Sequence, residues 1–108
     1  MVLRTNSRSA AMPSLLLLLL LLPRCAAAAD VEKGEIIAKR WCAACHLVAP
    51  EQKQAVADVP SFAAVARMKL PIDSLKAFLS DPHPRMPNLN LTRAEIEDIV
   101  AYIRSLGQ

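Results

Sequence analysis

Two cysteines and a histidine stand together in the stretch RWCAACH, where Cys42 and Cys45 are three residues apart and His46 follows directly. Thiols at this spacing can form a redox-active dithiol or a short disulfide loop, and together with a histidine they can ligate zinc. The same spacing also lets two cysteines form thioether bonds to one cofactor while the adjacent histidine ligates its metal. The rest of the chain has to distinguish these chemistries.

A redox dithiol of the thioredoxin type needs its cysteines after a strand in a βαβ unit, and this chain has no convincing strand pattern. A structural zinc site needs four ligands, but beyond these three side chains the sequence offers His83 and no second cysteine pair. A plain disulfide leaves His46 without a role. A haem accounts for every position, because C-x-x-C-H is itself a haem-attachment signal. We therefore predict one covalently attached haem c, bound through Cys42 and Cys45.

Residues 1–29 have the composition of a secretory signal peptide. Positive charges precede eight consecutive leucines at positions 15–22, and an alanine-rich exit follows. As a helix the leucine run would rise only about 12 Å, too little to span a bilayer. We predict cleavage after Ala29, with either of the two preceding alanines as a close alternative, and loss of Cys25 with the leader. An uncleaved membrane anchor is the competing interpretation.

The formal net charge of +3 belongs to this leader. Residues 30–108 contain ten Lys and Arg and ten Asp and Glu, so nothing in the charge balance indicates a nucleic-acid partner. A single domain of this size has a marginal core unless a disulfide, metal or cofactor completes it. We therefore predict one exported, periplasmic domain over residues 30–108, which a cofactor helps to stabilise.

The apolar spacing predicts helices and no convincing strand. Asp30 can cap a first helix, and one face of that helix is expected to carry residues at helical intervals, namely Gly34, Ile37, Ala38, Trp41 and Cys45. The stretch PSFAAVARM predicts a short helix after Pro60. The stretch PIDSLKAFLS predicts another, which ends at Asp81–Pro82; its apolar side is expected to comprise Ile72, Leu75, Phe78 and Leu79.

The last predicted helix has the clearest start signal. Thr92 and Glu95 have the spacing of a capping box. After them an apolar stripe continues at helical intervals through Ile96, Ile99, Val100, Ile103 and Leu106.

Four features occur together in this chain: WCAACH, VPSF after the following loop, PHPRMPNLNLTRAEIEDIVAYIRSL at the end, and Gly34 in the first helix. In this combination residues 30–108 resemble the small class I c-type cytochromes of the bacterial periplasm. The resemblance implies an all-α fold of about four short helices wrapped around one haem c. The departures are Val59, where the family has a glycine, and the tryptophan of the family near a haem propionate, for which Trp41 is no obvious counterpart.

The resemblance also implies roles for single residues. Gly34 is expected to meet Tyr102 where the first and last helices cross closely. The carbonyl of Pro60 is expected to accept the ring N–H of His46, which fixes a metal-bound ring. Met86 matches the methionine that ligates the iron opposite the histidine. The predicted cofactor-binding residues are Cys42, Cys45, His46, Pro60 and Met86, with His46 and Met86 on the metal.

Met86 is also favoured by its setting, because three prolines stiffen the segment around it and leave little entropy to lose when a thioether binds iron. His83 is the rival ligand, three residues earlier. Met68 follows the short helix and is interpreted as core filler.

With protein ligands on both sides, the iron could exchange one electron and little else. The resemblance thus implies a one-electron carrier of a periplasmic respiratory chain with low-spin haem, not an enzyme. Its expected partners are a redox donor and acceptor, either a membrane complex or a dehydrogenase, with no nucleic acid or small-molecule substrate; the protein is expected to be monomeric. The alternatives are a haem subunit of a periplasmic dehydrogenase or oxidase, or a gas or redox sensor in which Met86 dissociates.

Five basic residues lie in segments that surround the exposed haem edge in the family. They form either a docking patch for an acidic partner or scattered solubilising charge, and they are Lys53, Arg67, Lys69, Lys76 and Arg85.

Overall fold

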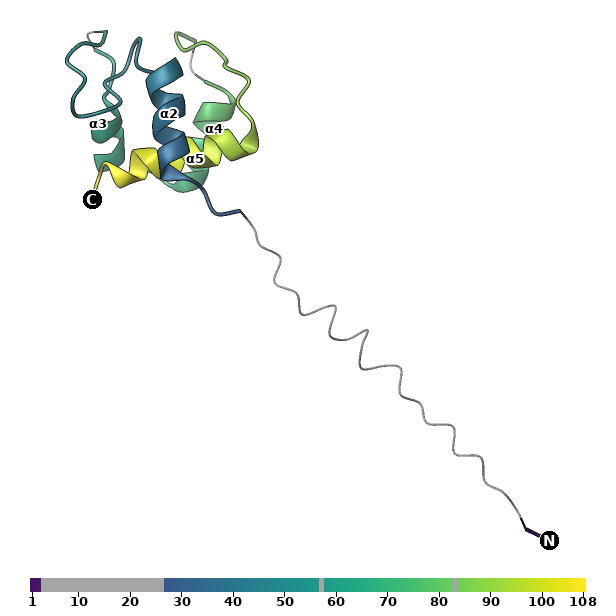
Figure 1. The fold of residues 1–108 in the computed structure, drawn as a ribbon. Coiled ribbons are helices and arrows are strands. Elements are labelled where there is room, and N and C mark those ends of the chain that lie inside the picture. The colour runs from purple at the N-terminus through teal and green to yellow at the C-terminus, as the bar shows by residue number, and fades with distance from the viewer. Residues whose placement is uncertain (3–26, 57, 83) are drawn as a thin grey trace.

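The computed structural model describes residues 1–2, 27–56, 58–82 and 84–108. Within these ranges the chain forms helices and no strand, as predicted (Figure 1); the helices are α2 (Val31–Trp41), α3 (Phe62–Arg67), α4 (Ile72–Ser80) and α5 (Arg93–Ser105). Most of the predicted leader, including Cys25, and His83 lie outside the described residues. No helix in the described ranges has the length and apolarity needed to cross a membrane.

Side chains just before the helices fix where α2 and α5 begin. The Asp30 carboxylate accepts a hydrogen bond from the backbone N–H of Lys33 at 3.1 Å. At α5 the Thr92 hydroxyl accepts from the Glu95 N–H at 3.2 Å, and the Glu95 carboxylate accepts from the Thr92 N–H at 2.8 Å. The predicted capping box is therefore confirmed, and it satisfies backbone donors that a helix start leaves unpaired.

Helix α5 is the centre of the fold, because α2, α3 and α4 all pack on it. The crossing of α2 over α5 is visible in Figure 1 and is very close. A β-carbon built on Gly34 would lie 2.0 Å from the carbonyl oxygen of Asp98 and 2.9 Å from the Cβ of Tyr102. The expected meeting of Gly34 and Tyr102 is present, and only glycine fits there.

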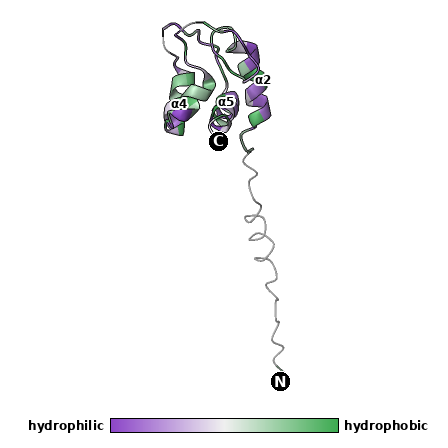
Figure 2. Cartoon of the chain, turned by 90° about the vertical axis from the view of Figure 1, so that its left-hand side faces the viewer, coloured by the Kyte–Doolittle hydropathy of each residue, from purple (hydrophilic) through white to green (hydrophobic). Residues whose placement is uncertain are grey.

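The core is formed mainly by α5. Its predicted apolar stripe is confirmed, with Ile96, Ile99, Val100 and Ile103 buried and Leu106 half-buried. The main cluster adds Tyr102 of α5 and residues from α2, α3 and the loop between them, namely Ala38, Cys42, Val48, Ala49 and Phe62. Figure 2 shows that α2 and α4 each carry both hydrophobic and hydrophilic residues.

One predicted helix face needs correction. On α2, Trp41 is 52% exposed and Cys45 is also exposed, whereas Cys42 is buried. The helix ends at Trp41, and its buried face runs at four-residue steps from Gly34 through Ala38 to Cys42. On α4 the predicted apolar side is confirmed for Leu75, Phe78 and Leu79, which line one cavity. Of this side only Leu75 is buried and Leu79 half-buried, while Ile72 and Phe78 are exposed.

Candidate functional site

The cysteine–histidine motif forms one further turn at the end of α2. The N–H of His46 donates to the carbonyl of Cys42 at 2.9 Å, and the N–H of Cys45 donates to the same carbonyl at 3.1 Å. A backbone bond four residues back is a helical turn, which directs residues four apart to the same side. Cys42 and His46 accordingly line the same cavity.

The His46 ring is oriented by contacts on two sides. Its Nδ1 lies 2.7 Å from the carbonyl oxygen of Pro60, the contact that was expected. Because a carbonyl can only accept, Nδ1 carries a proton, and in the neutral ring Nε2 then has a free lone pair. The Phe62 ring packs against the His46 ring, with 5.6 Å between the ring centroids. Phe62 is itself held in place, because its N–H donates to the carbonyl of Leu47 at 2.9 Å. Nε2 is therefore the nitrogen available to a metal.

Two cavities meet at this histidine. One, of about 480 Å³, extends between α3, α4 and α5; apart from His46 and Ser74 its lining is apolar or sulfur-bearing. The other, of about 510 Å³, lies against the exposed end of α2. Both volumes are in the range of cofactor sites, about 300–1,000 Å³. The residues that line both cavities are Cys42, His46, Pro60 and Met86.

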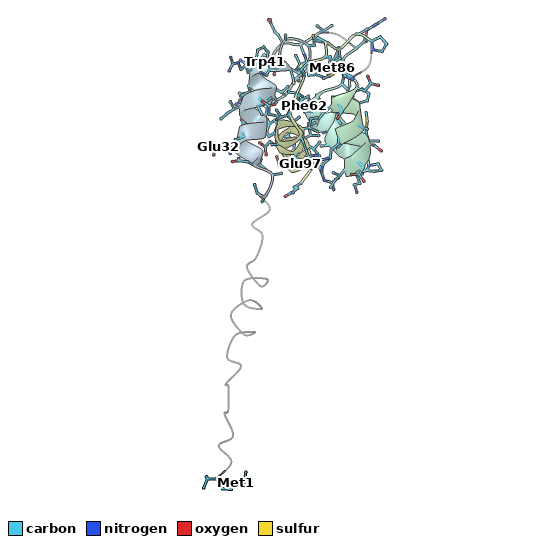
Figure 3. The ribbon with its side chains drawn as sticks, turned by 90° about the vertical axis from the view of Figure 1, so that its right-hand side faces the viewer. Met1, Glu32, Trp41, Phe62, Met86 and Glu97 are labelled. Carbon is cyan, nitrogen blue, oxygen red and sulfur yellow. The ribbon has the colours of Figure 1, made fainter. Side chains whose placement is uncertain are left out.

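Four of the five predicted site residues thus line both cavities, and Cys45 lines the second. In Figure 3, Trp41 and Met86 lie on one side of the helical part and Glu32 and Glu97 on the opposite side, with Phe62 between them. The donor set fits a haem c, because it combines two thiols, a neutral imidazole with a fixed ring, a thioether and apolar walls. The two cavity volumes, about 480 and 510 Å³, also fit a haem.

Met68 is not core filler, which corrects its interpretation. Met68 is 57% exposed and lines the apolar cavity between α3, α4 and α5 together with Met86. The short helix before it ends at Arg67, so Met68 lies past the last turn that packs on α5. The rival ligand, His83, falls outside the described residues.

The two thiols are in different environments. Burial raises the pKa of Cys42 to about 11, and the nearby Cys45 adds to this shift. Cys45 is exposed. As a free thiol in this fold, Cys42 stays protonated at neutral pH, and its sulfur can react only in the small fraction that is thiolate.

Gln52 is a residue that the sequence patterns did not single out. Its Nε2 lies within 2.9 Å of three carbonyl oxygens, those of Ala43, His46 and Gln54. Its Oε1 accepts from the N–H of Val48 at 3.0 Å. This amide therefore connects the inside of the cysteine motif, the histidine and the loop that follows.

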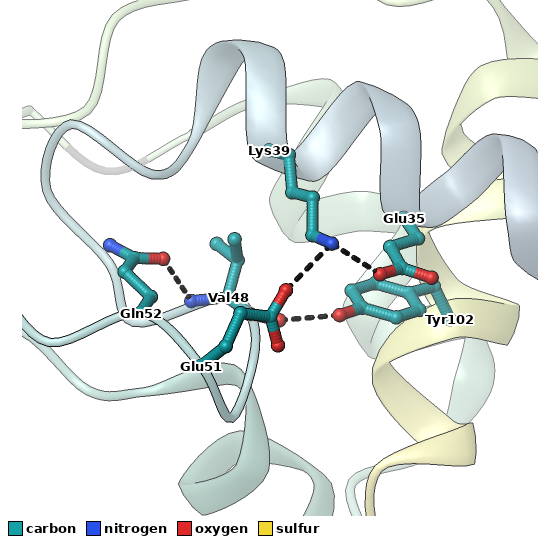
Figure 4. A network of polar contacts seen from close by, with 6 residues as sticks. All are labelled: Glu35, Lys39, Val48, Glu51, Gln52 and Tyr102. Carbon is teal, nitrogen blue, oxygen red and sulfur yellow. Dashed lines mark hydrogen bonds and ion pairs between the residues drawn. The ribbon is translucent and has the colours of Figure 1, made fainter.

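A second polar group fixes the same loop to the helices (Figure 4). The Tyr102 hydroxyl donates to the carbonyl of Val48 at 2.6 Å, in a buried setting. Burial chiefly, and the negative charge of Glu35, raise the pKa of Tyr102. The ammonium of Lys39 pairs with Glu35 at 2.6 Å and with Glu51 at 2.8 Å, and these bonds raise the pKa of Lys39. Lys39 of α2 is therefore a bridge between this helix and the loop.

The five basic residues of the predicted patch are not equivalent. Lys76 pairs with Glu97 at 3.4 Å, which neutralises its charge locally. Arg85 lines the second cavity beside Met86. Lys53, Arg67 and Lys69 are exposed.

Comparison with known proteins adds evidence of another kind. Residues 29–103 match the family described as "Cytochrome C oxidase, cbb3-type, subunit III". A relative, cytochrome c-552 of Bradyrhizobium diazoefficiens, is 56% identical over 82 residues, which is 75% of this chain and 79% of the relative. No solved structure matches the chain significantly. The family match spans the cysteine pair, His46, Pro60 and Met86.

Proposed function

The chain belongs to the c-type cytochromes, and we propose that it carries single electrons on one haem c attached to Cys42 and Cys45, with His46 and Met86 as the iron ligands. Its family membership identifies a monohaem electron carrier, not an enzyme. The observation that carries the assignment of His46 is its Nδ1–carbonyl contact of 2.7 Å with Pro60, at the place where the two cavities meet; Met86 is assigned because it lines both cavities with His46.

Each residue has a definite task in this proposal. Bound haem supplies an iron that changes by one electron. His46, fixed by Pro60, presents Nε2 in one orientation, and hydrogen bonding at Nδ1 makes that nitrogen a stronger donor. The Met86 thioether favours the reduced iron and so raises the reduction potential relative to two histidines. The apolar side chains of α3, α4 and α5 exclude water from the site.

We further propose that the protein works in the periplasm after removal of residues 1–29, and that it exchanges electrons with membrane redox complexes. The family description names a subunit of a cbb3-type oxidase, which supports an oxidase complex as acceptor or assembly partner. Arg85 is the basic residue best placed to meet such a partner at the site, because it lines the second cavity with Cys45.

The ligands are tested by carbon monoxide binding to the reduced protein, followed by absorption. The parent should resist carbon monoxide, and Met86→Ala should bind it and show a lower reduction potential. Met68→Ala is the matched control, since Met68 lines the same cavity, and it should change neither property. Loss of the native spectrum in His83→Ala would make His83 the ligand. Rapid binding by the parent would instead favour a sensor or a haem subunit of an enzyme.

Covalent attachment is tested separately. Pigment should remain with the protein after acid–acetone extraction, and it should become extractable when Cys42 and Cys45 are both replaced by Ala. Free extraction from the parent would contradict haem c.

A further inference from the structure

The backbone nitrogen of Asp30 has a partner far along the chain. Its N–H donates to the Oδ1 of Asp98 at 2.7 Å, between residues 68 positions apart. The bond joins the residue before α2 to the middle of α5, so it forms only when the two helices have crossed. Both residues are half-buried, whereas residues 27–29, immediately before, are exposed.

This nitrogen is also the atom that leader removal would release. Hydrolysis of the Ala29–Asp30 peptide bond leaves a carboxylate on Ala29 and an amine on Asp30, which takes up a proton at neutral pH. The amine nitrogen is the same atom that now lies 2.7 Å from a carboxylate oxygen. A cut one or two residues earlier leaves a neutral amide at Asp30 and places the new charge on the exposed segment.

We propose that cleavage after Ala29 creates a site for the chain's own amino terminus, in which the carboxylate of Asp98 binds the α-ammonium group of Asp30. The inference rests on the export step of the proposed function and is independent of the haem ligands. In this proposal, removal of the leader has a structural result, because it forms a charged hydrogen bond between the start of α2 and the middle of α5.

The charges around this nitrogen explain why Asp98 is needed. The pKa of the Asp30 carboxyl is lowered, chiefly by the hydrogen bond from the backbone N–H of Lys33, so this carboxyl stays ionised. The Lys33 ammonium also lies 3.5 Å from the carboxylate. An ammonium at the start of a helix is opposed by the helix dipole. The Asp98 carboxylate offsets this opposition, and a charge-assisted hydrogen bond is stronger than the neutral one that it replaces.

The test compares haem-loaded chains that start at Asp30 with chains that start at Ala28, each with and without Asp98→Asn, by urea unfolding at pH 6.5. Asparagine has nearly the same shape, keeps one acceptor oxygen and removes the charge. We expect Asp98→Asn to raise the unfolding equilibrium constant about three- to tenfold more in the chain that starts at Asp30. Asp81→Asn, which changes an exposed carboxylate after α4, should have the same effect in both chains.

The difference should depend on pH in one direction. Asp98 raises the pKa of the amine in the folded state above its usual value of about 7.7–8.0. The added stability is therefore complete below about pH 7.7 and is lost as the pH rises through the folded pKa. Equal effects of Asp98→Asn in both chains, or a difference that persists at pH 10, would overturn the proposal.

The exported protein separates this inference from the proposed function. Its mass should show a chain that starts at Asp30 and carries one haem. A haem-bearing protein that starts at Ala28, or retains its leader, overturns the terminal site and leaves the electron carrier standing. A chain that starts at Asp30 but carries no haem would overturn the electron carrier and leave the terminal site standing.

Discussion

Gly34 of α2 lies so close to Asp98 of α5 that a β-carbon at residue 34 would stand 2.0 Å from the Asp98 carbonyl oxygen. Since that neighbour is backbone, no side-chain rotation relieves the contact, and Gly34→Ala must move the two helices apart. We expect the free energy of unfolding of the haem-loaded protein to fall by about 3 kcal/mol, measured in urea.

The glycine-matched control is Gly107→Ala. A β-carbon at residue 107 would lie 3.1 Å from the Cβ of Ala66. Because residue 107 is followed only by Gln108, the chain end can shift to relieve this contact. A loss of about 1 kcal/mol or less is expected there. An unchanged urea midpoint in Gly34→Ala would contradict the close crossing.

Tyr102→Phe should destabilise the protein, because the buried carbonyl of Val48 loses its hydrogen-bond donor. The expected loss is about 1–3 kcal/mol near pH 7. The raised pKa of Tyr102 gives a stabilisation that is complete below the unfolded value of about 10 and is lost as the pH rises through the folded value. The parent should thus lose stability above about pH 10, and Tyr102→Phe should lose less over that range. If the free energies of unfolding of the two proteins changed with pH in parallel, Tyr102 would not be a source of the stability lost at alkaline pH.

Gln52→Leu should loosen the loop after the cysteine motif. The leucine side chain approximates the size of glutamine but leaves the Val48 N–H and the carbonyls of Ala43 and His46 without their partner. We expect a loss of about 2 kcal/mol and faster hydrogen exchange at the Val48 amide. Gln54→Leu, an exposed position on the same loop, is the control and should change neither. Unaltered Val48 exchange in Gln52→Leu would remove Gln52 from this role.

The haem-free chain should be largely unfolded, because it lacks the group that completes a small core. Alkylation of reduced, haem-free protein measures this directly. In an unfolded chain Cys42 and Cys45 should react at similar rates at pH 7. If the chain kept the present fold, Cys42, with its pKa of about 11, would react far more slowly than the exposed Cys45. The ratio of the two modified peptides by mass spectrometry distinguishes the two states.

The start of α5 could be predicted because its signal is local. Thr92 and Glu95 are three residues apart, and the residues that follow repeat at a helical interval. Trp41 could not be placed in this way, since helical spacing alone does not show where a helix ends. The Arg40 guanidinium lies 4.9 Å from the centre of the Trp41 ring, on the exposed side.

Ile72 and Phe78 show another limit. A helical period identifies an apolar face, but it does not say how much of that face another element covers. Gln52 carried no signal at all, because its acceptors are backbone carbonyls, which any residue type would provide. The role of Gln52 depends on the folded loop, which brings these backbone groups within hydrogen-bond distance of its side chain.

Few side chains of this protein are wholly enclosed: among the described residues, the large ones exposed by less than 2% are Ile99 and Val48. If haem completes the core as proposed, a chain that fails to receive it stays unfolded and open to proteases. The amount of this protein that persists in the cell is then set by the supply and attachment of haem as well as by synthesis. A fold that is incomplete without its cofactor thus removes inactive copies before they can occupy a redox partner.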